Sequence, residues 1–401
     1  MNLRSLTKTC TRLVAFGAVF VFSAHALAQE PKQLCVAEIE NMPESWKPSA
    51  SVRRYLNPAP WSPREAKRAT LSIGRGVDEM INYFKRKPSA LFNVGADSIE
   101  AIIQVTYASA NAPELDEKAR SAARKYLTTL SKPFLQRSED SITCNEFGKL
   151  LPLAIFAHRL YPKDDWRTKR LTTLTNVAFE ECETLKIAAD IDIDAILGDK
   201  NSTPKALLDL YVWVLWFTEA QLFPDIKLPE ASKTWGPRFW TYTKNYKLRD
   251  ANEFEEGPFD EGFIAVADLA PHMAHLITAT HRYKLRVSDA PNLYRWHREN
   301  FYAALEVGEL DLFASVVDTL RQYGCTAEND KQVRDGTRYL LKVFSEGEDS
   351  WMDYRQDGET DENIDDYGIV HYPWTAILGV RVRKFENPGP DNLGGIVRSW
   401  N

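Results

Sequence analysis

The sequence predicts an all-α protein, and more specifically an α/α toroid or a curved α-solenoid of about twelve helices in two layers. Along its 401 residues, helical hydrophobic periodicity recurs between clusters of Pro, Gly, Asp and Asn. No run of period-two alternation predicts a strand. Some predicted helices are apolar nearly all round and others carry a single apolar stripe, and this mixture favours inner helices covered by outer ones.

The N-terminus predicts a cleavable secretory signal peptide over residues 1–28. Three basic residues precede an apolar stretch from Leu13 to Ala24, which is too short to cross a bilayer of about 30 Å. The triplet Ala26-Leu27-Ala28 then offers small residues at the two positions that a signal peptidase reads. We therefore expect cleavage after Ala28 and a periplasmic or secreted protein. A retained N-terminal anchor is the alternative.

The rest of the chain divides into a lead-in, one helical domain and a tail. Residues 29–61 are rich in Pro and predict an extended lead-in. The helical domain covers residues 62–386 and starts at Ser62-Pro63-Arg64-Glu65, a capping box with Pro at the first helical position. Residues 387–401 are expected to form a C-terminal loop. The predicted helices cover residues 63–86, 96–110, 113–131, 139–161, 164–186, 202–220, 232–244, 258–283, 288–306, 309–323, 328–344 and 371–384.

The two-layer prediction depends on two kinds of helix. Residues 206–217 are apolar on nearly every face, and residues 263–279 are almost as apolar. Residues 116–130 and 329–344 have one apolar stripe and one charged face instead. Because the connections are short, neighbouring helices are expected to pack as antiparallel hairpins.

Charge and motifs exclude several classes of function. Signal cleavage removes three positive charges and no negative one, so the formal net charge changes from −6 to −9. A chain this acidic has no broad electrostatic attraction for nucleic acid, and no later segment is apolar enough to span a membrane. The chain also lacks a Gly-rich phosphate loop, a Gly-x-Ser-x-Gly elbow and a His-Glu-x-x-His helix.

The cysteines predict a disulfide. Cys35, Cys144, Cys182 and Cys325 remain after cleavage, and an even number in an oxidising compartment favours disulfides, with three ways to pair. If the helices 139–161 and 164–186 form a hairpin, Cys144 and Cys182 lie at nearly the same height on neighbouring helices. We therefore expect them to be bonded. Two buried free thiols are the alternative.

Residues 328–383 resemble one repeat of the α/α toroids of terpenoid cyclases and protein prenyltransferases. The resemblance extends from Tyr339-Leu340-Leu341 through Asp349-Ser350-Trp351 to His371-Tyr372-Pro373-Trp374-Thr375-Ala376. In those families a helix leads through Gln-x-x-Asp-Gly-Ser-Trp into a helix that opens with a Trp-Thr-Ala-like element. The resemblance implies the toroid architecture and no catalytic residue, because the cyclases' Asp-rich motif and the prenyltransferases' zinc ligands have no counterpart.

The most specific polar pattern lies in the predicted helix 258–283. Glu261, Asp268, His272 and His275 fall within about 60° of one another on an otherwise apolar helix. Buried acids and imidazoles are costly without partners, so such groups bind a metal, exchange protons with a substrate or bond to each other. A purely structural hydrogen-bond network is the alternative.

A second group of candidate residues consists of aromatic and polar side chains that can bind a ligand. Asp366 belongs to an acid-rich segment, residues 361–367, that leads to His371, and a solvated helix cap is the alternative interpretation of this segment. Trp374 comes one turn after His371, and Trp235 and Trp240 flank Gly236-Pro237. Aromatic and acidic residues in a cleft suit a neutral sugar chain, and suit a hydrophobic ligand nearly as well. His371 and Asp366 are also potential further ligands if His272 and His275 bind a metal.

These patterns support three hypotheses about function. The first is a hydrolase or lyase for an envelope or extracellular glycan, with Glu261 or Asp268 as the carboxylate and His272 or His275 as its proton-transfer partner. The second is a non-catalytic helical scaffold that binds a polymer or a protein. The third is a metal-dependent enzyme that uses His272 and His275.

Overall fold

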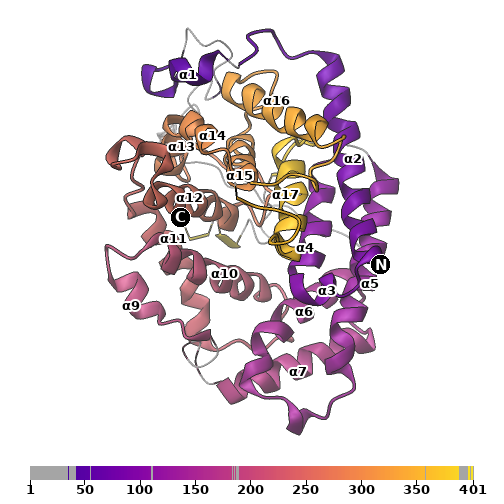
Figure 1. Ribbon diagram of the computed structural model, residues 1–401. Helices are drawn as coiled ribbons and strands as arrows, with labels where there is room; N and C mark the ends of the chain where they lie inside the picture. The colour runs from indigo at the N-terminus through magenta and orange to yellow at the C-terminus, as the bar shows by residue number, and fades with distance from the viewer. Residues whose placement is uncertain are drawn as a thin grey trace, which may run out of the picture. The chain divides into compact units, whose positions relative to one another are not determined.

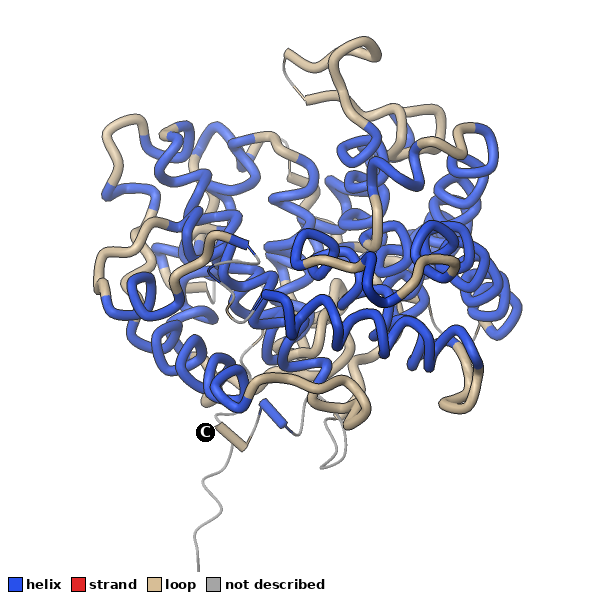
Figure 2. Tube along the Cα trace, turned by 90° about the horizontal axis from the view of Figure 1, so that it is seen from below, coloured by secondary structure: helices blue, strands red, loops and turns tan. Residues whose placement is uncertain are grey.

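The described residues of the protein are almost all helical or in the loops between helices. The computed structural model describes residues 35, 42–54, 56–109, 112–182, 184, 186, 189–356, 358–387, 396–397 and 399–400. The predicted signal peptide and its cleavage site lie outside these residues. Within this part of the chain there are helices and no strand, apart from an isolated bridge between Tyr283 and Glu386. The all-α prediction is confirmed, and Figure 2 shows blue helices joined by tan loops.

The helices of the unit Cys35–Asn401 are labelled in Figure 1. In chain order they are α1 (Ala50–Arg53), α2 (Pro63–Arg86), α3 (Ala90–Val94), α4 (Asp97–Gln104), α5 (Pro113–Leu135), α6 (Phe147–Leu160), α7 (Trp166–Cys182), α9 (Ile193–Gly198), α10 (Pro204–Ala220), α11 (Trp235–Asn245), α12 (Glu261–Ile277), α13 (Pro291–Glu299), α14 (Phe301–Val307), α15 (Leu310–Gln322), α16 (Lys331–Glu346) and α17 (Asp366–Gly379).

Some predicted helix boundaries are confirmed and others are wrong. The capping box at Ser62 starts α2, with the Ser62 amide donating to Glu65 Oε2 at 2.8 Å. The helix predicted to start at residue 139 starts at Phe147 instead, because a second capping box between Thr143 and Glu146 closes a separate 3-10 turn before it. The last helix, α17, starts at Asp366 rather than at residue 371, because the Asp365 carboxylate caps it.

Two other predicted helices are shorter than expected. The helix predicted over 288–306 divides at Asn300 into α13 and α14, so the described residues contain more helices than expected. The helix predicted over 258–283 ends at Ile277, and residues 279–281 form a left-handed turn.

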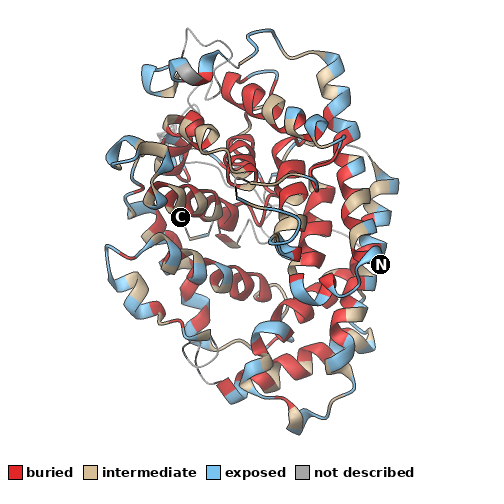
Figure 3. Ribbon diagram, viewed as in Figure 1, coloured by how far each residue is buried: buried red, intermediate tan, exposed pale blue. Residues whose placement is uncertain are grey.

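Helix α15 is the most enclosed part of the fold. It contacts α12, α16 and α17, eleven of its residues are buried, and Figure 3 shows it mostly in red. Gly336 of α16 permits one of these contacts, because a Cβ atom at that position would lie 2.4 Å from Val317 of α15. Other contacts link α6 with α10, α10 with α12, and α17 with α4.

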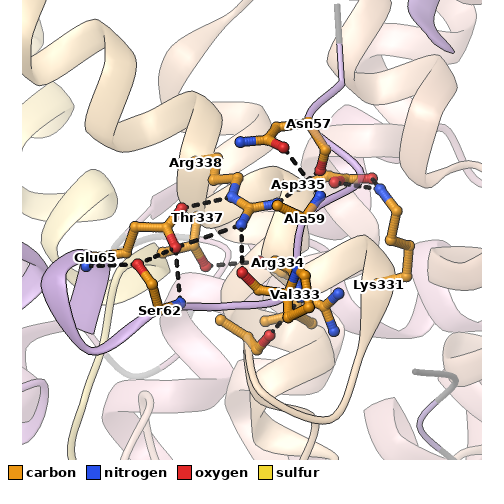
Figure 4. A network of polar contacts seen from close by, with 12 residues as sticks. Asn57, Ala59, Ser62, Glu65, Lys331, Val333, Arg334, Asp335, Thr337 and Arg338 are labelled. Carbon is orange, nitrogen blue, oxygen red and sulfur yellow. Dashed lines mark hydrogen bonds and ion pairs between the residues drawn. The ribbon is translucent and has the colours of Figure 1, made fainter. Parts of the chain in front are cut away.

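A polar network attaches the lead-in to α16 (Figure 4). The Arg338 guanidinium donates to Glu65 Oε1 at 2.7 Å, to the Asn57 carbonyl at 2.7 Å and to the Pro60 carbonyl at 3.1 Å. Arg338 thereby holds together the end of the lead-in and the start of α2.

The cysteines form two pairs at disulfide distance. Cys144 and Cys182 are joined with a Cα–Cα separation of 4.7 Å, as predicted from the sequence. Cys144 belongs to the 3-10 turn before α6 and not to the helix itself, but that turn also packs on α7. Cys35 and Cys325, for which the sequence offered no geometric argument, form the second pair. Both pairs are compatible with an extracellular protein.

None of the described helices combines the length and the apolar character that crossing a membrane requires.

Candidate functional site

A cavity of about 150 Å³ lies among α4, α10, α12, α15 and α17. Four of the chain's seven histidines line it, together with two acids from α4. Among the residues that the structure describes, no Lys or Arg lines this cavity. Its polar and aromatic lining residues are Asp97, Glu100, Gln104, Tyr211, Trp216, His272, His275, Thr280, His281, Ser315, Tyr367, His371, Trp374 and Thr375.

Glu100 is a buried acid in the wall of the cavity. It is 5% exposed, on an apolar turn of α4 between Ile99 and Ala101. Burial raises the pKa of its carboxyl to about 7, against the nearby positive charge of Arg159. Gln104 Nε2 donates to Glu100 Oε1 at 2.6 Å, and Gln104 Oε1 accepts from Trp374 Nε1 at 2.9 Å. This chain of hydrogen bonds fixes the orientation of a carboxyl group that changes its charge near neutral pH.

His371 lies on α17 and pairs with Asp311 at the start of α15. Its Nδ1 is 3.1 Å from Asp311 Oδ2. Burial acts to lower the pKa of His371, but the hydrogen bond and charge of Asp311, with the charges of Asp268 and Asp97, raise it above its ordinary value. Asp311 therefore favours the protonated form of His371 and also orients its ring.

Asp97 precedes Glu100 by one turn of α4. Burial raises the pKa of Asp97 to about 6, although the charge of His371 lowers it. Two carboxyl groups and one imidazole, each with a raised pKa, therefore share one cavity, and such groupings are typical of acid–base sites.

The turn after α12 places another imidazole, that of His281, in the cavity. Ala279, Thr280 and His281 have φ angles of 49°, 52° and 69°, a region that costs non-glycine residues energy. His281 Nδ1 lies 2.6 Å from Asp318 Oδ2, and its ring centre is 3.9 Å from that of His275. The surrounding contacts thus hold a strained backbone that brings two buried histidines together.

The structure brings together three of the four residues of the predicted stripe on α12. His272 Nδ1 lies 2.7 Å from the Asp268 carbonyl, and the rings of His272 and His275 are 5.4 Å apart. Both histidines line the cavity, whereas Asp268 is not one of its lining residues and has a half-exposed side chain 3.5 Å from His272 Nδ1. Glu261 is exposed in the first turn of α12 and lies outside the cavity.

The predicted ligand-binding residues are divided between the cavity and other parts of the fold. His371 and Trp374 line the cavity. Trp235 and Trp240 are buried away from it, the first against Phe217 with ring centres 4.7 Å apart. Asp366 is buried and accepts from Asn93 at 2.6 Å and from Lys87 at 2.7 Å, so it fastens α17 to the segment around α3.

Several residues of the site were missed from the sequence. Asp97 and Glu100 lie in the predicted helix 96–110. Glu100 stands beside the apolar residues Ile99, Ala101 and Ile102, and this pattern could have indicated a buried acid. The partners Asp311 and Asp318 had no such signal, because they are brought to His371 and His281 only by tertiary packing.

Comparison of the chain with protein-family models, with curated proteins and with solved structures finds no match.

Proposed function

We propose that the protein is an exported glycan hydrolase whose acid–base groups surround the cavity between α4, α12 and α17. The observation that carries the proposal is that one cavity contains two groups suited to acid–base chemistry. One is Glu100, whose pKa is raised to about 7, and the other is His371, whose pKa is raised by its partner Asp311. Hydrolysis of a glycosidic bond needs one group that protonates the leaving oxygen and another that activates water.

The protonation states decide which group takes which role. The raised pKa of His371 favours the imidazolium form, which can donate a proton to the departing oxygen. The Glu100 carboxyl is close to half ionised at pH 7, so its carboxylate form can accept a proton from water. Asp97 on the same helix is a second carboxylate that can stabilise positive charge on the sugar ring.

The charge of the lining favours a neutral glycan over an acidic one. Asp97 and Glu100 line the cavity, Asp311 and Asp268 lie next to His371, and among the described residues no Lys or Arg faces the cavity. A uronic-acid chain would meet this negative charge without a Lys or Arg among the described lining residues to neutralise its carboxylate, and the imidazole of His371 is already paired with Asp311. The lack of a Lys or Arg in the described lining also favours hydrolysis over β-elimination, because elimination requires that the carboxylate of the uronic acid be neutralised.

The size and aromatic lining fit one sugar unit of a longer chain. A volume of about 150 Å³ is smaller than the 300–1,000 Å³ that is typical of pockets for a whole drug-sized ligand. The rings of Tyr367 and His371 stack with centres 5.0 Å apart, and Trp374 packs edge-on against His371 at 5.5 Å. These rings offer apolar faces to a sugar ring, while the acids offer hydrogen-bond acceptors to its hydroxyl groups.

The proposal includes the α/α toroid expected from the sequence. The contacts of α6 with α10, α10 with α12, α12 with α15, α15 with α17 and α17 with α4 support an inner set of helices around the cavity. Contacts of α5 and α7 with α6, α11 with α10, and α2 and α16 with α17 support an outer set. In this arrangement helices from both the N-terminal and the C-terminal half of the chain contribute residues to the site.

The proposal is tested with the mature chain, starting at Gln29, on a panel of neutral and uronate-containing polysaccharides. New reducing ends are expected from a neutral glycan, with a loss of about 100-fold or more in the His371→Ala variant. An unsaturated product from a uronate chain would replace hydrolysis by elimination. Binding of a glycan without any cleavage would favour the non-catalytic scaffold instead.

A further inference from the structure

We infer that His275, His281 and Asp318 form a binding site for Zn²⁺ in the wall of the cavity. One candidate ligand atom from each residue lies within 4.8 Å of the other two. The inference goes beyond the proposed function, whose acid–base groups are Glu100 and His371, and it does not depend on which glycan is cleaved.

The three side chains are buried, and two of them have polar atoms without a partner. His275 is 4% exposed, His281 is 7% exposed and Asp318 is not exposed. Among the described residues, the Nε2 atom of His275 and the Oδ1 atom of Asp318 have no hydrogen-bond partner. Buried polar atoms nearly always have a hydrogen-bond partner, so two neighbouring buried side chains that each have an unpaired polar atom need an explanation. A bound cation would satisfy both.

The backbone around His281 provides an independent reason for a ligand. The left-handed turn of residues 279–281 is held by hydrogen bonds from the Thr280 amide to the His275 carbonyl at 2.9 Å and from Arg381 Nη1 to the His281 carbonyl at 2.5 Å. These bonds place the imidazole of His281 directly against that of His275. Strained segments of this kind cluster at ligand sites, and metal coordination would offset the strain.

The surrounding charges leave the carboxylate of Asp318 available. Asp318 Oδ2 receives a hydrogen bond from Gln322 Nε2 at 2.7 Å, besides its contact with His281. Two buried arginines, Arg321 and Arg381, lie close enough to affect Asp318. The described hydrogen bonds of Arg321 go to the Gly379 carbonyl and the Thr337 hydroxyl, and those of Arg381 go to the Arg383 and His281 carbonyls. The positive charge nearby weakens cation binding without occupying the ligand atoms.

The chemical type of the three ligand atoms determines which class of metal ion the site prefers. Two imidazole nitrogens with one carboxylate suit Zn²⁺ and its first-row neighbours, whereas Mg²⁺ and Ca²⁺ prefer oxygen ligands throughout. Three protein ligands leave a coordination position for water, as in catalytic zinc sites. His272 also lines the cavity, but its Nδ1 contacts the Asp268 carbonyl and it does not belong to the three-residue group.

The site is tested on the full mature chain after removal of metal with a chelator. Titration with Zn²⁺ should release or absorb heat with one ion per chain, and the Tm should rise with Zn²⁺ concentration because the ion binds the folded state. Co²⁺ in place of Zn²⁺ should give visible absorption bands of a nitrogen- and oxygen-ligated ion. The absence of both a Tm shift and the Co²⁺ bands in the wild-type chain would overturn the inference.

Variants identify the ligands. His275→Gln, His281→Gln and Asp318→Asn should each weaken Zn²⁺ binding by about 100-fold or more, while His297→Gln should leave it unchanged. His297 is a suitable control because it is fully buried, with an unpartnered Nε2 of its own among the described residues, but lies outside the group. Unchanged Zn²⁺ affinity in the three ligand variants would overturn the inference. If a ligand variant does not fold, X-ray absorption of the zinc-loaded wild type decides between histidine and other ligands.

Failure of this inference can be separated from failure of the proposed function. Glu100→Gln should bind Zn²⁺ as the wild type does, since Glu100 is not in the metal group. A chain that hydrolyses a glycan without binding Zn²⁺ would overturn the metal site alone. A chain that binds Zn²⁺ and cleaves no glycan would overturn only the proposed function.

Discussion

His371 Nδ1 lies 3.1 Å from Asp311 Oδ2, although the two residues are 60 positions apart in the chain and belong to α17 and α15. The contact between these two helices therefore sets the protonation of an imidazole in the cavity. Burial acts to lower the pKa of His371, and Asp311 is the largest of the influences that raise it.

The Asp311→Asn variant is expected to lower the pKa of His371. If the imidazolium is the proton donor, the alkaline limb of the activity profile should move to lower pH in this variant. NMR titration of the histidine ring protons measures the pKa itself. Asp268→Asn serves as the control, because Asp268 contributes only its charge and should produce a smaller shift. Equal titration of His371 in the wild type and in Asp311→Asn would contradict the role of the pair.

Glu100 should make the protein less stable as the pH rises. Its pKa is raised from an ordinary 4.5 to about 7, so the folded chain binds this proton more tightly than the unfolded chain does. The resulting stabilisation is complete below pH 4.5 and is lost as the pH rises to about 7, with a total on the order of 3 kcal/mol. In Glu100→Gln this loss should disappear.

Urea unfolding at pH 5 and pH 8 measures that effect. Relative to the wild type, Glu100→Gln should gain free energy of unfolding at pH 8, while the exposed control Glu261→Gln should not. A parallel pH dependence in the wild type and Glu100→Gln would show that Glu100 is an ordinary acid.

The Cys144–Cys182 disulfide should contribute substantially to stability. It closes a loop with a sequence separation of 38, for which the chain-entropy relation gives about 4 kcal/mol. Replacement of both cysteines by serine is expected to lower the free energy of unfolding by a few kcal/mol, measured by urea unfolding with Cys35 and Cys325 intact. Peptide mapping without reduction should recover Cys144 and Cys182 in one linked species. Two alkylated free thiols in exported protein would refute the bond.

The mature N-terminus should be Gln29. Signal peptidase reads the small residues of Ala26-Leu27-Ala28, so the intact mass of protein recovered from its native compartment should lack residues 1–28. A chain that still starts at Met1 would contradict the predicted export and the oxidising environment assumed for the disulfides.

The helical class and two of the residues that line the cavity can be predicted from the sequence because their patterns are local. The periodicity of α12 and the capping box at Ser62 involve neighbours within a few residues, and both predictions depend only on helix geometry. The helical period singles out His272 and His275, and both line the cavity. Glu261 was grouped with them by angle alone, but it belongs to the first turn of α12, which is open to solvent.

The missed features depend on the conformation and packing of distant residues. Residues 279–281 continue the helical pattern of α12 in sequence, yet they adopt a left-handed turn that turns His281 back toward His275. Asp318 belongs to a helix whose other residues pack the core, so nothing in its local pattern connects it with His281. Such pairings become visible only when the helices are in contact.

Glu100 is the residue on which the proposed hydrolysis most depends, so the rate of its Gln variant is the sharpest test of that hydrolysis. Release of reducing ends from the preferred neutral glycan is compared for the wild type, Glu100→Gln and Glu261→Gln. Glu100→Gln is expected to lose between about 100-fold and 10,000-fold in kcat, while Glu261→Gln, altered outside the cavity, is expected to retain the wild-type rate. A Glu100→Gln variant that remains as active as the wild type would contradict the assignment of this cavity as the active site.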